Sequence, residues 1–133
     1  MNIFNVNGTD FGIGKVICEI EDGIIKHLEI TGDENVVKSM FEEDDEDSEW
    51  SWILYPPKVS FHKIPFEQKG DKIQIEITDE LSDEYDITFY LTEHHNIYGT
   101  LIIDGNHIGI KGEIRNYMSD EKLYSLEVAA EKH

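Results

Sequence analysis

The sequence predicts a mainly β protein, an antiparallel meander of about eight or nine strands with one short helix near residues 33–41. Apolar residues alternate with polar residues through the second half of the chain, which is the period of a strand because successive side chains point to opposite faces. Turn pairs containing glycine separate several of these runs. The length of 133 residues suits a single domain covering residues 1–133. A curved sheet, a closed barrel and a sandwich all fit this pattern.

The first predicted hairpin joins a strand over residues 14–21 to a strand over residues 23–31. Asp22-Gly23 is a common turn pair because both residues tolerate a positive φ. If these two residues form the loop, the expected register is Glu19 opposite Lys26 and Ile17 opposite Leu28.

A short helix is expected next. Asp33 is a suitable N-cap, and Glu34 suits the positive end of the helix dipole. The predicted apolar stripe consists of Val36, Val37, Met40 and Phe41. The helix should end before residues 42–49, because like charges repel at i,i+4 and acids oppose the dipole at a C-terminus. We therefore interpret residues 42–49 as a solvated loop.

Two extended pieces follow, over residues 50–55 and 59–64. Trp50, Trp52 and Leu54 alternate with Ser51, Ile53 and Tyr55 before Pro56-Pro57. Proline donates no ladder hydrogen bond, so these prolines predict a sheet edge or a crossing point for this region.

The last five predicted strands lie near residues 73–77, 85–91, 97–103, 108–114 and 124–130. Gly105-Asn106 suits a two-residue type II′ loop, because glycine at its first position allows a positive φ. That loop predicts the following opposite pairs: Asp104–His107, Ile103–Ile108, Leu101–Ile110 and Ile97–Ile114. Apolar residues of one face then meet each other, which a one-residue slip would prevent.

The charge of the chain limits its partners. Asp and Glu number 29 against 11 Lys and Arg, a net charge of −18. Such a chain repels phosphate backbones and anionic lipid, so we expect neither a nucleic-acid nor a membrane partner. The N-terminus has no basic and apolar leader pattern, and we expect a cytoplasmic protein. The single cysteine excludes an internal disulfide and a cysteine-based zinc site.

Motif searches suggest no enzymatic chemistry. Gly12-Ile13-Gly14-Lys15 lacks the first glycine and the hydroxyl residue of a phosphate loop, and the acidic runs lack the pattern of an EF-hand. Cys18 lies in an apolar run and is expected to be a small buried hydrophobe. His94-His95 is interpreted as a polar turn, where adjacent side chains make poor chelating geometry. We therefore expect no catalytic residue, no metal and no cofactor.

An acidic run followed by aromatic residues is the candidate partner-binding segment. Seven acids occupy eight positions from Glu42 to Glu49, and tryptophans and a tyrosine follow directly. An anionic field beside rigid aromatic anchors suits a cationic partner, although the aromatics could instead pack in the core and the run could only aid solubility. The candidate residues are Glu42, Glu43, Asp44, Asp45, Glu46, Asp47, Glu49, Trp50, Trp52 and Tyr55.

In type, the chain resembles the immunity proteins of bacterial polymorphic-toxin and contact-dependent inhibition systems. The features that carry the resemblance are the run Glu42–Glu49, the segment Trp50–Pro57 and the hairpin Ile97–Ile114. Members of that class bind one cognate toxin, often a basic nuclease, and block its active site or docking surface. The resemblance implies a positively charged protein partner, which would be a toxin domain.

Three functional hypotheses follow. The first is a non-enzymatic acidic protein that neutralises a basic protein partner, which the charge and the lack of catalytic motifs favour. The second is a β-barrel carrier of a small ligand, whose interior would have to be wide enough. The third is an enzyme with a site around His94 and His95.

Overall fold

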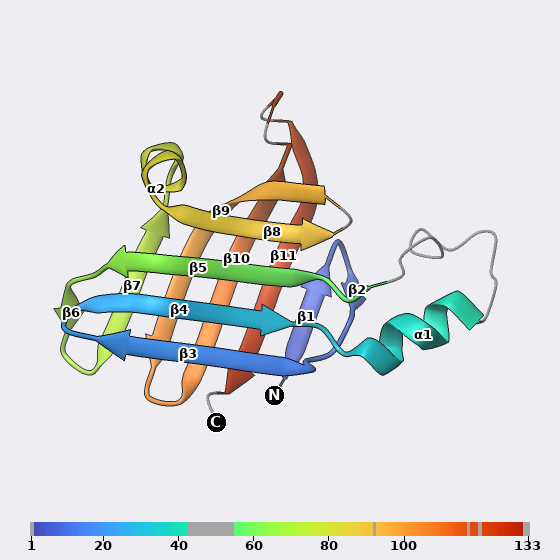
Figure 1. Cartoon of the computed structure of the whole chain (residues 1–133), viewed down its shortest axis with the longest axis horizontal. Coiled ribbons are helices and arrows are strands. Elements are labelled where there is room, and N and C mark those ends of the chain that lie inside the picture. Colours follow the sequence, from blue (N-terminus) through green and yellow to red (C-terminus); the bar gives the residue numbers. More distant parts are fainter. Residues whose placement is uncertain (1, 43–54, 92, 117, 120, 132–133) are drawn as a thin grey trace.

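The computed structural model describes residues 2–42, 55–91, 93–116, 118–119 and 121–131 (Figure 1). The strands are β1 (Ile3–Val6), β2 (Thr9–Asp10), β3 (Lys15–Glu21), β4 (Ile24–Thr31), β5 (Lys58–Pro65), β6 (Gln68–Lys69), β7 (Lys72–Ile77), β8 (Asp86–Leu91), β9 (Glu93–Asp104), β10 (His107–Arg115) and β11 (Lys122–Glu131). The helices are α1 (Glu34–Glu42) and α2 (Asp79–Glu84). The predicted mainly β, antiparallel fold is confirmed.

The strands form one curled antiparallel sheet. Its main order is β2-β1-β11-β10-β9-β8-β5-β4-β3, and β7 joins it at β9 with β6 alongside. In Figure 1 the front layer of β3, β4, β5 and β8 runs across the strands behind it, which include β9, β10 and β11. The sequence left a curved sheet, a closed barrel and a sandwich open, and the structure has the curved sheet.

The strand β9 connects the two layers. Its first residues pair with β8, as in His95 opposite Phe89, while its later residues pair with β7 and β10. At the bend, Gly99 lies opposite Gly112 and has a φ of 143°. A Cβ on Gly112 would lie 1.9 Å from the carbonyl oxygen of Tyr98, so the two strands approach too closely for a side chain.

The core lies between the two layers and consists of the inward faces of the strands. The predicted alternation in the last five strands is confirmed by burial of the following residues: Ile73, Ile75, Ile77, Ile87, Phe89, Leu91, Ile97, Leu101, Ile103, Ile108, Ile110, Ile114, Leu126, Val128 and Ala130. Together with the buried residues of the front layer they form one hydrophobic cluster. Period-two patterning is thus sufficient to identify which side chains of these strands face inward.

The hairpin β9–β10 has the predicted register. His107 lies opposite Asp104, Ile108 opposite Ile103, Leu101 opposite Ile110, and Ile97 opposite Ile114. Gly105 has a φ of 60°, as the first central position of a type II′ turn requires.

The register predicted for the first hairpin is wrong. Asp22 and Gly23 do form the loop with positive φ, but an irregularity between Glu19 and Ile20 shifts the pairing. The observed pairs are Glu19–His27, Cys18–Leu28 and Ile17–Glu29. The physical reason is burial: strict alternation would place Ile25 and Leu28 on opposite faces, whereas the extra residue lets both point inward at 0% exposure.

The helix α1 begins as predicted, and a second helix was not predicted. The Asp33 carboxylate accepts a hydrogen bond from the backbone N–H of Asn35 at 2.8 Å, which is an N-cap contact. The short helix α2 begins after Thr78, whose side chain accepts from the N–H of Leu81. Six residues are too few for a helical period to appear in the sequence.

Two details of strand placement differ from the predictions. Of the sheet edge and the crossing point predicted for this region, the edge does not hold for β5, because β5 pairs with β4 on one side and β8 on the other. Pro57 precedes this strand and Pro65 is its last residue, so neither interrupts the ladder. The meander also breaks at β7, which pairs with β9 instead of its sequence neighbour β8 because α2 intervenes.

Candidate functional site

Neither described helix covers the outward face of the front layer (Figure 1). Because side chains alternate, one row across β4, β5 and β8 contains Glu29 opposite Ser60 and Ser60 opposite Thr88. The next row contains His27 opposite His62 and His62 opposite Asp86. We use the name front polar face for the side chains of five of these residues: Glu29, Ser60, Thr88, His27 and His62.

Two histidines stack on this face. The rings of His27 and His62 have centroids 4.5 Å apart and an interplanar angle of 23°. The Nε2 atom of His62 lies 2.8 Å from the hydroxyl of Ser60. The Nε2 atom of His27 is buried and has no hydrogen-bond partner within the described part of the chain. Sequence reasoning missed this pair, because β4 and β5 are joined by a long connection whose length does not fix their register.

Glu29 is the centre of the charges on this face. Its carboxylate lies 3.8 Å from Lys15 Nζ, 3.9 Å from Lys58 Nζ and 3.6 Å from His27 Nε2. The Glu29 side chain is 16% exposed, whereas both lysines are largely exposed. Positive groups therefore balance this acid locally, and the front polar face is less acidic than the chain as a whole.

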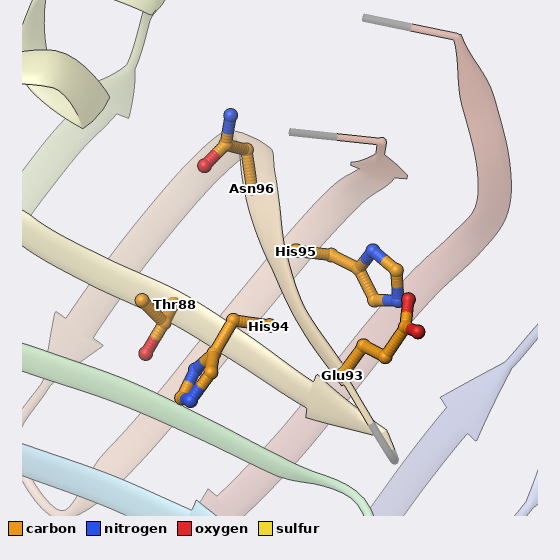
Figure 2. Close-up of a pocket in the computed structure, with 5 residues that line it drawn as sticks. All are labelled: Thr88, Glu93, His94, His95 and Asn96. Carbon is orange, nitrogen blue, oxygen red and sulfur yellow. The ribbon is translucent and has the colours of Figure 1, made fainter. Parts of the chain in front are cut away.

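A pocket opens beside this face where the sheet divides. The ladder between β8 and β9 ends at Phe89 opposite His95, and the next residues, Thr88 and Asn96, are no longer paired with each other. A pocket of about 470 Å³ lies here, and Figure 2 shows the side chains that line it. The lining residues are Thr88, Glu93, His94, His95 and Asn96.

His95 is the buried polar group of this pocket. Its side chain is only 8% exposed, and its Nδ1 atom has no hydrogen-bond partner in the described ranges. Burial lowers the pKa of His95, the nearby Glu93 carboxylate partly opposes this shift, and His94 reinforces it. The imidazole is therefore neutral at neutral pH, and it can donate one hydrogen bond through one ring nitrogen and accept one through the other.

The interpretation of His94-His95 as a polar turn is wrong. Both residues belong to β9, opposite Tyr90 and Phe89 respectively. Figure 2 shows the two imidazoles pointing away from each other, as adjacent residues of a strand must. His94 contacts the ring of Tyr90 edge-on at 5.1 Å between centroids. Within the residues that the structure describes, no group of three or more His, Cys, Asp or Glu could hold a metal ion.

The strongest concentration of described acids is on and beside α2. Asp79, Glu80, Asp83, Glu84 and Asp86 are all exposed, and α2 contains no buried residue. We call these five residues the acidic ridge, which stands at one end of the sheet (Figure 1).

One cation lies against the acidic ridge. The guanidinium of Arg115 is 3.9 Å from Asp79, and it also pairs with Glu113 and lies 4.2 Å from the ring centroid of Tyr98. Its charge is thus shared with Glu113 and Tyr98 as well as Asp79, so it offsets little of the charge of the ridge.

Most of the predicted partner-binding residues lie outside the described residues: Glu43, Asp44, Asp45, Glu46, Asp47, Glu49, Trp50 and Trp52. Glu42 is the last residue of α1. Tyr55 is described and is 71% exposed, so it is not a core residue. It lines a pocket of about 360 Å³ with Lys58 and Tyr90, beside the front polar face.

No protein-family model, curated protein or solved structure matches this chain. The helices that the structure describes include none long and apolar enough to cross a membrane.

Proposed function

We propose that this chain is a non-enzymatic acidic protein that binds and neutralises a positively charged protein, as an immunity protein binds its cognate toxin. The observation that carries the proposal is the acidic ridge. Its five carboxylates are all exposed, and they belong to a chain whose net charge is −18.

The ridge is built for an electrostatic role. Four of its acids occupy α2, a helix without buried residues, and the fifth, Asp86, is the exposed first residue of β8, so they contribute no core packing. Asp79 and Glu80 in the first turn stabilise the positive end of the helix dipole, but Asp83 and Glu84 lie at the end where acids oppose it. Since the last turn contains no basic residue, local helix stability does not account for the charge there.

A surface of this kind acts mainly on encounter rates. Fields of several kT steer an oppositely charged partner and raise association rates by about 10- to 1,000-fold at low salt. At physiological ionic strength the Debye length is about 8 Å, so the effect falls steeply when salt is added. The ridge would draw in the partner, and shorter-range contacts would then hold it.

The exposed Tyr55 is the described candidate for such a contact. A tyrosine supplies a rigid, amphipathic surface and is enriched at binding hot spots. Tyr55 lies three residues after the predicted segment of residues 42–52, which we propose as the second part of the binding surface. Block of a toxin active site would follow from placing these residues over its cationic cleft.

The test begins with capture of the partner from the native cell and purification of the most basic protein retained, with the product of the neighbouring gene as the first candidate. Association with that protein is then followed by stopped-flow fluorescence between about 0.05 and 0.5 M salt, a range over which the Debye length falls about threefold. We expect the association rate to fall at least about tenfold.

A charge-matched pair of variants separates the ridge from the total charge. The ridge variant E80Q/D83N/E84Q/D86N keeps Asp79 and therefore its contact with Arg115. The control variant D71N/D104N/E127Q/E131Q removes the same number of exposed acids elsewhere. The ridge variant should associate about three- to tenfold more slowly than the control. The proposal is wrong if no basic partner is retained, or if its association rate does not depend on salt.

A further inference from the structure

Among the strands that the structure describes, β3 is the one long strand at a free edge of the sheet. At one end of the main strand order lies β2, which has two residues, and β6, also of two residues, covers the free side of β7. At the other end lies β3, with seven residues, and β4 is the strand that pairs with it. Very short edge strands protect a sheet from pairing with another chain, and β3 lacks that protection.

We propose that β3 pairs antiparallel with β3 of a second copy of this chain, with Cys18 of the two copies opposite each other. The proposal commits to a second copy because the strand is complementary to itself in this register. Lys15 then lies opposite Glu21 of the second copy, Val16 opposite its Ile20, and Ile17 opposite its Glu19.

The two faces of the strand support this register. Val16, Cys18 and Ile20 are half-buried and pack against the core, so they belong to the inward face. In the proposed pairing each of them meets an apolar inward residue of the second copy. Lys15 and Glu21 belong to the outward face, where an opposite-charge pair directly across two strands is favourable.

The proposed register is the one that pairs all seven residues of β3. A two-residue shift in one direction sets Lys15 opposite Glu19 of the second copy, but it pairs only five residues of β3 and places Ile20 opposite Gly14. The same shift in the other direction also pairs only five residues, and it places Glu19 opposite Glu19. The length of the paired segment therefore favours the register centred on Cys18.

Two copies of net charge −18 repel at long range, but the contact itself is attractive. Adjacent strands lie about 4.8 Å apart, well within the Debye length of about 8 Å at physiological ionic strength. Moderate salt therefore screens the overall repulsion more than it weakens the Lys15–Glu21 pairs. Dimer formation should strengthen from low to moderate salt, which is opposite to the salt dependence expected for the basic partner.

The expected dimer is weak. Seven paired residues span only about 24 Å, and such a contact falls below the roughly 1,200–2,000 Å² of a stable interface. Association should therefore be followed by sedimentation velocity at chain concentrations from about 10 μM to about 1 mM.

Charge-swap variants test the register. K15E replaces both Lys15–Glu21 attractions with repulsions and should weaken dimerisation by about tenfold. The control K111E makes the same change in net charge on β10, where Lys111 faces Glu127 within one chain, and should weaken dimerisation less than about threefold. The double variant K15E/E21K restores opposite charges across the proposed contact and should recover dimerisation.

Cross-linking supplies a second measurement. Opposite residues of an antiparallel pair have Cα atoms about 4.5–5.5 Å apart, which lies within the range for a disulfide. Mild oxidation should therefore give a covalent dimer of the wild-type chain that is absent in C18S and much slower in K15E. A chain that stays monomeric at about 1 mM, equal effects of K15E and K111E, or a dimer that cannot be oxidised through Cys18 would each overturn the proposal. None of these outcomes bears on the basic partner.

Discussion

Replacement of Gly112 by alanine is expected to be severely destabilising, although it adds a single methyl group. The added Cβ would lie 1.9 Å from the carbonyl oxygen of Tyr98 and 2.7 Å from the Cα of Gly99. Both neighbours are backbone atoms of β9, so no side chain can rotate away to make room. The strands β9 and β10 would have to separate by more than 1 Å at the bend, as judged from ordinary Cβ contacts of at least about 3.0 Å.

The expected loss in the free energy of unfolding can be worked out from the contacts that this separation of β9 and β10 disrupts. Overpacking in a tight site costs about 1–3 kcal/mol, and each weakened ladder hydrogen bond about 0.5–1.5 kcal/mol more. With two such bonds affected, the free energy of unfolding should fall by at least about 3 kcal/mol, a large part of the 5–15 kcal/mol typical of a domain.

Gly109 is a matched control in the same strand. A Cβ at this position would meet its nearest neighbour, the carbonyl oxygen of Val128, at 4.0 Å, which is an ordinary contact. Alanine at this position should stabilise the protein by about 0.5–1 kcal/mol because it restricts the unfolded chain.

The assay is equilibrium urea unfolding followed by tryptophan fluorescence and circular dichroism. With an m-value of about 2 kcal/mol/M, Gly112→Ala should lower the midpoint by about 1.5 M, while Gly109→Ala should leave it equal or slightly higher. Stabilities of the two variants within about 1 kcal/mol of each other would refute the close approach at the bend.

Four further outcomes are expected. Asp10→Ala removes an acceptor of two backbone N–H groups and should cost about 1–3 kcal/mol in urea unfolding, whereas Asp10→Ser should cost less. Thr78→Ala removes the N-cap of α2 and should cost about 1 kcal/mol by the same assay. Burial lowers the pKa of His95 below its ordinary value of 6.5, so the unfolded chain binds a proton at this residue more readily than the folded chain does. The stability that this histidine contributes is therefore present above pH 6.5 and is lost as the pH falls through the lowered pKa of the folded chain. His95→Phe should reduce this pH dependence of the free energy of unfolding, whereas the exposed His107→Ala should not. Replacement of residues 42–49 by Ser and Asn should slow association with the basic partner more than it speeds dissociation, and an unchanged association rate would exclude this segment from steering.

Local patterns predicted the parts of the fold that local forces decide. The hairpin at Gly105-Asn106 was predictable because apolar residues match across the loop in only one good register. The first hairpin differs because burial of both Ile25 and Leu28 requires an extra residue in β4. A bulge of this kind is selected by the core as a whole, so period-two reasoning placed the register one residue away.

The candidate site was less predictable because it depends on contacts between distant parts of the chain. His27 and His62 stack only because β4 pairs with β5 in one register, and their separation in sequence carries no information about that register. The burial of His95 likewise depends on its place in β9 opposite Phe89, where the sequence suggested a turn. The acidic character of the surface, in contrast, was evident from composition alone.

The most direct test of the proposed function is the association rate of the purified basic partner with three proteins, measured as a function of ionic strength. These are the wild-type chain, the ridge variant E80Q/D83N/E84Q/D86N and the control D71N/D104N/E127Q/E131Q. The ridge variant should associate most slowly at low salt, and the three rates should converge at about 0.5 M salt, where the Debye length is only about 4 Å. Identical rates for the three proteins at low salt would contradict the proposed function.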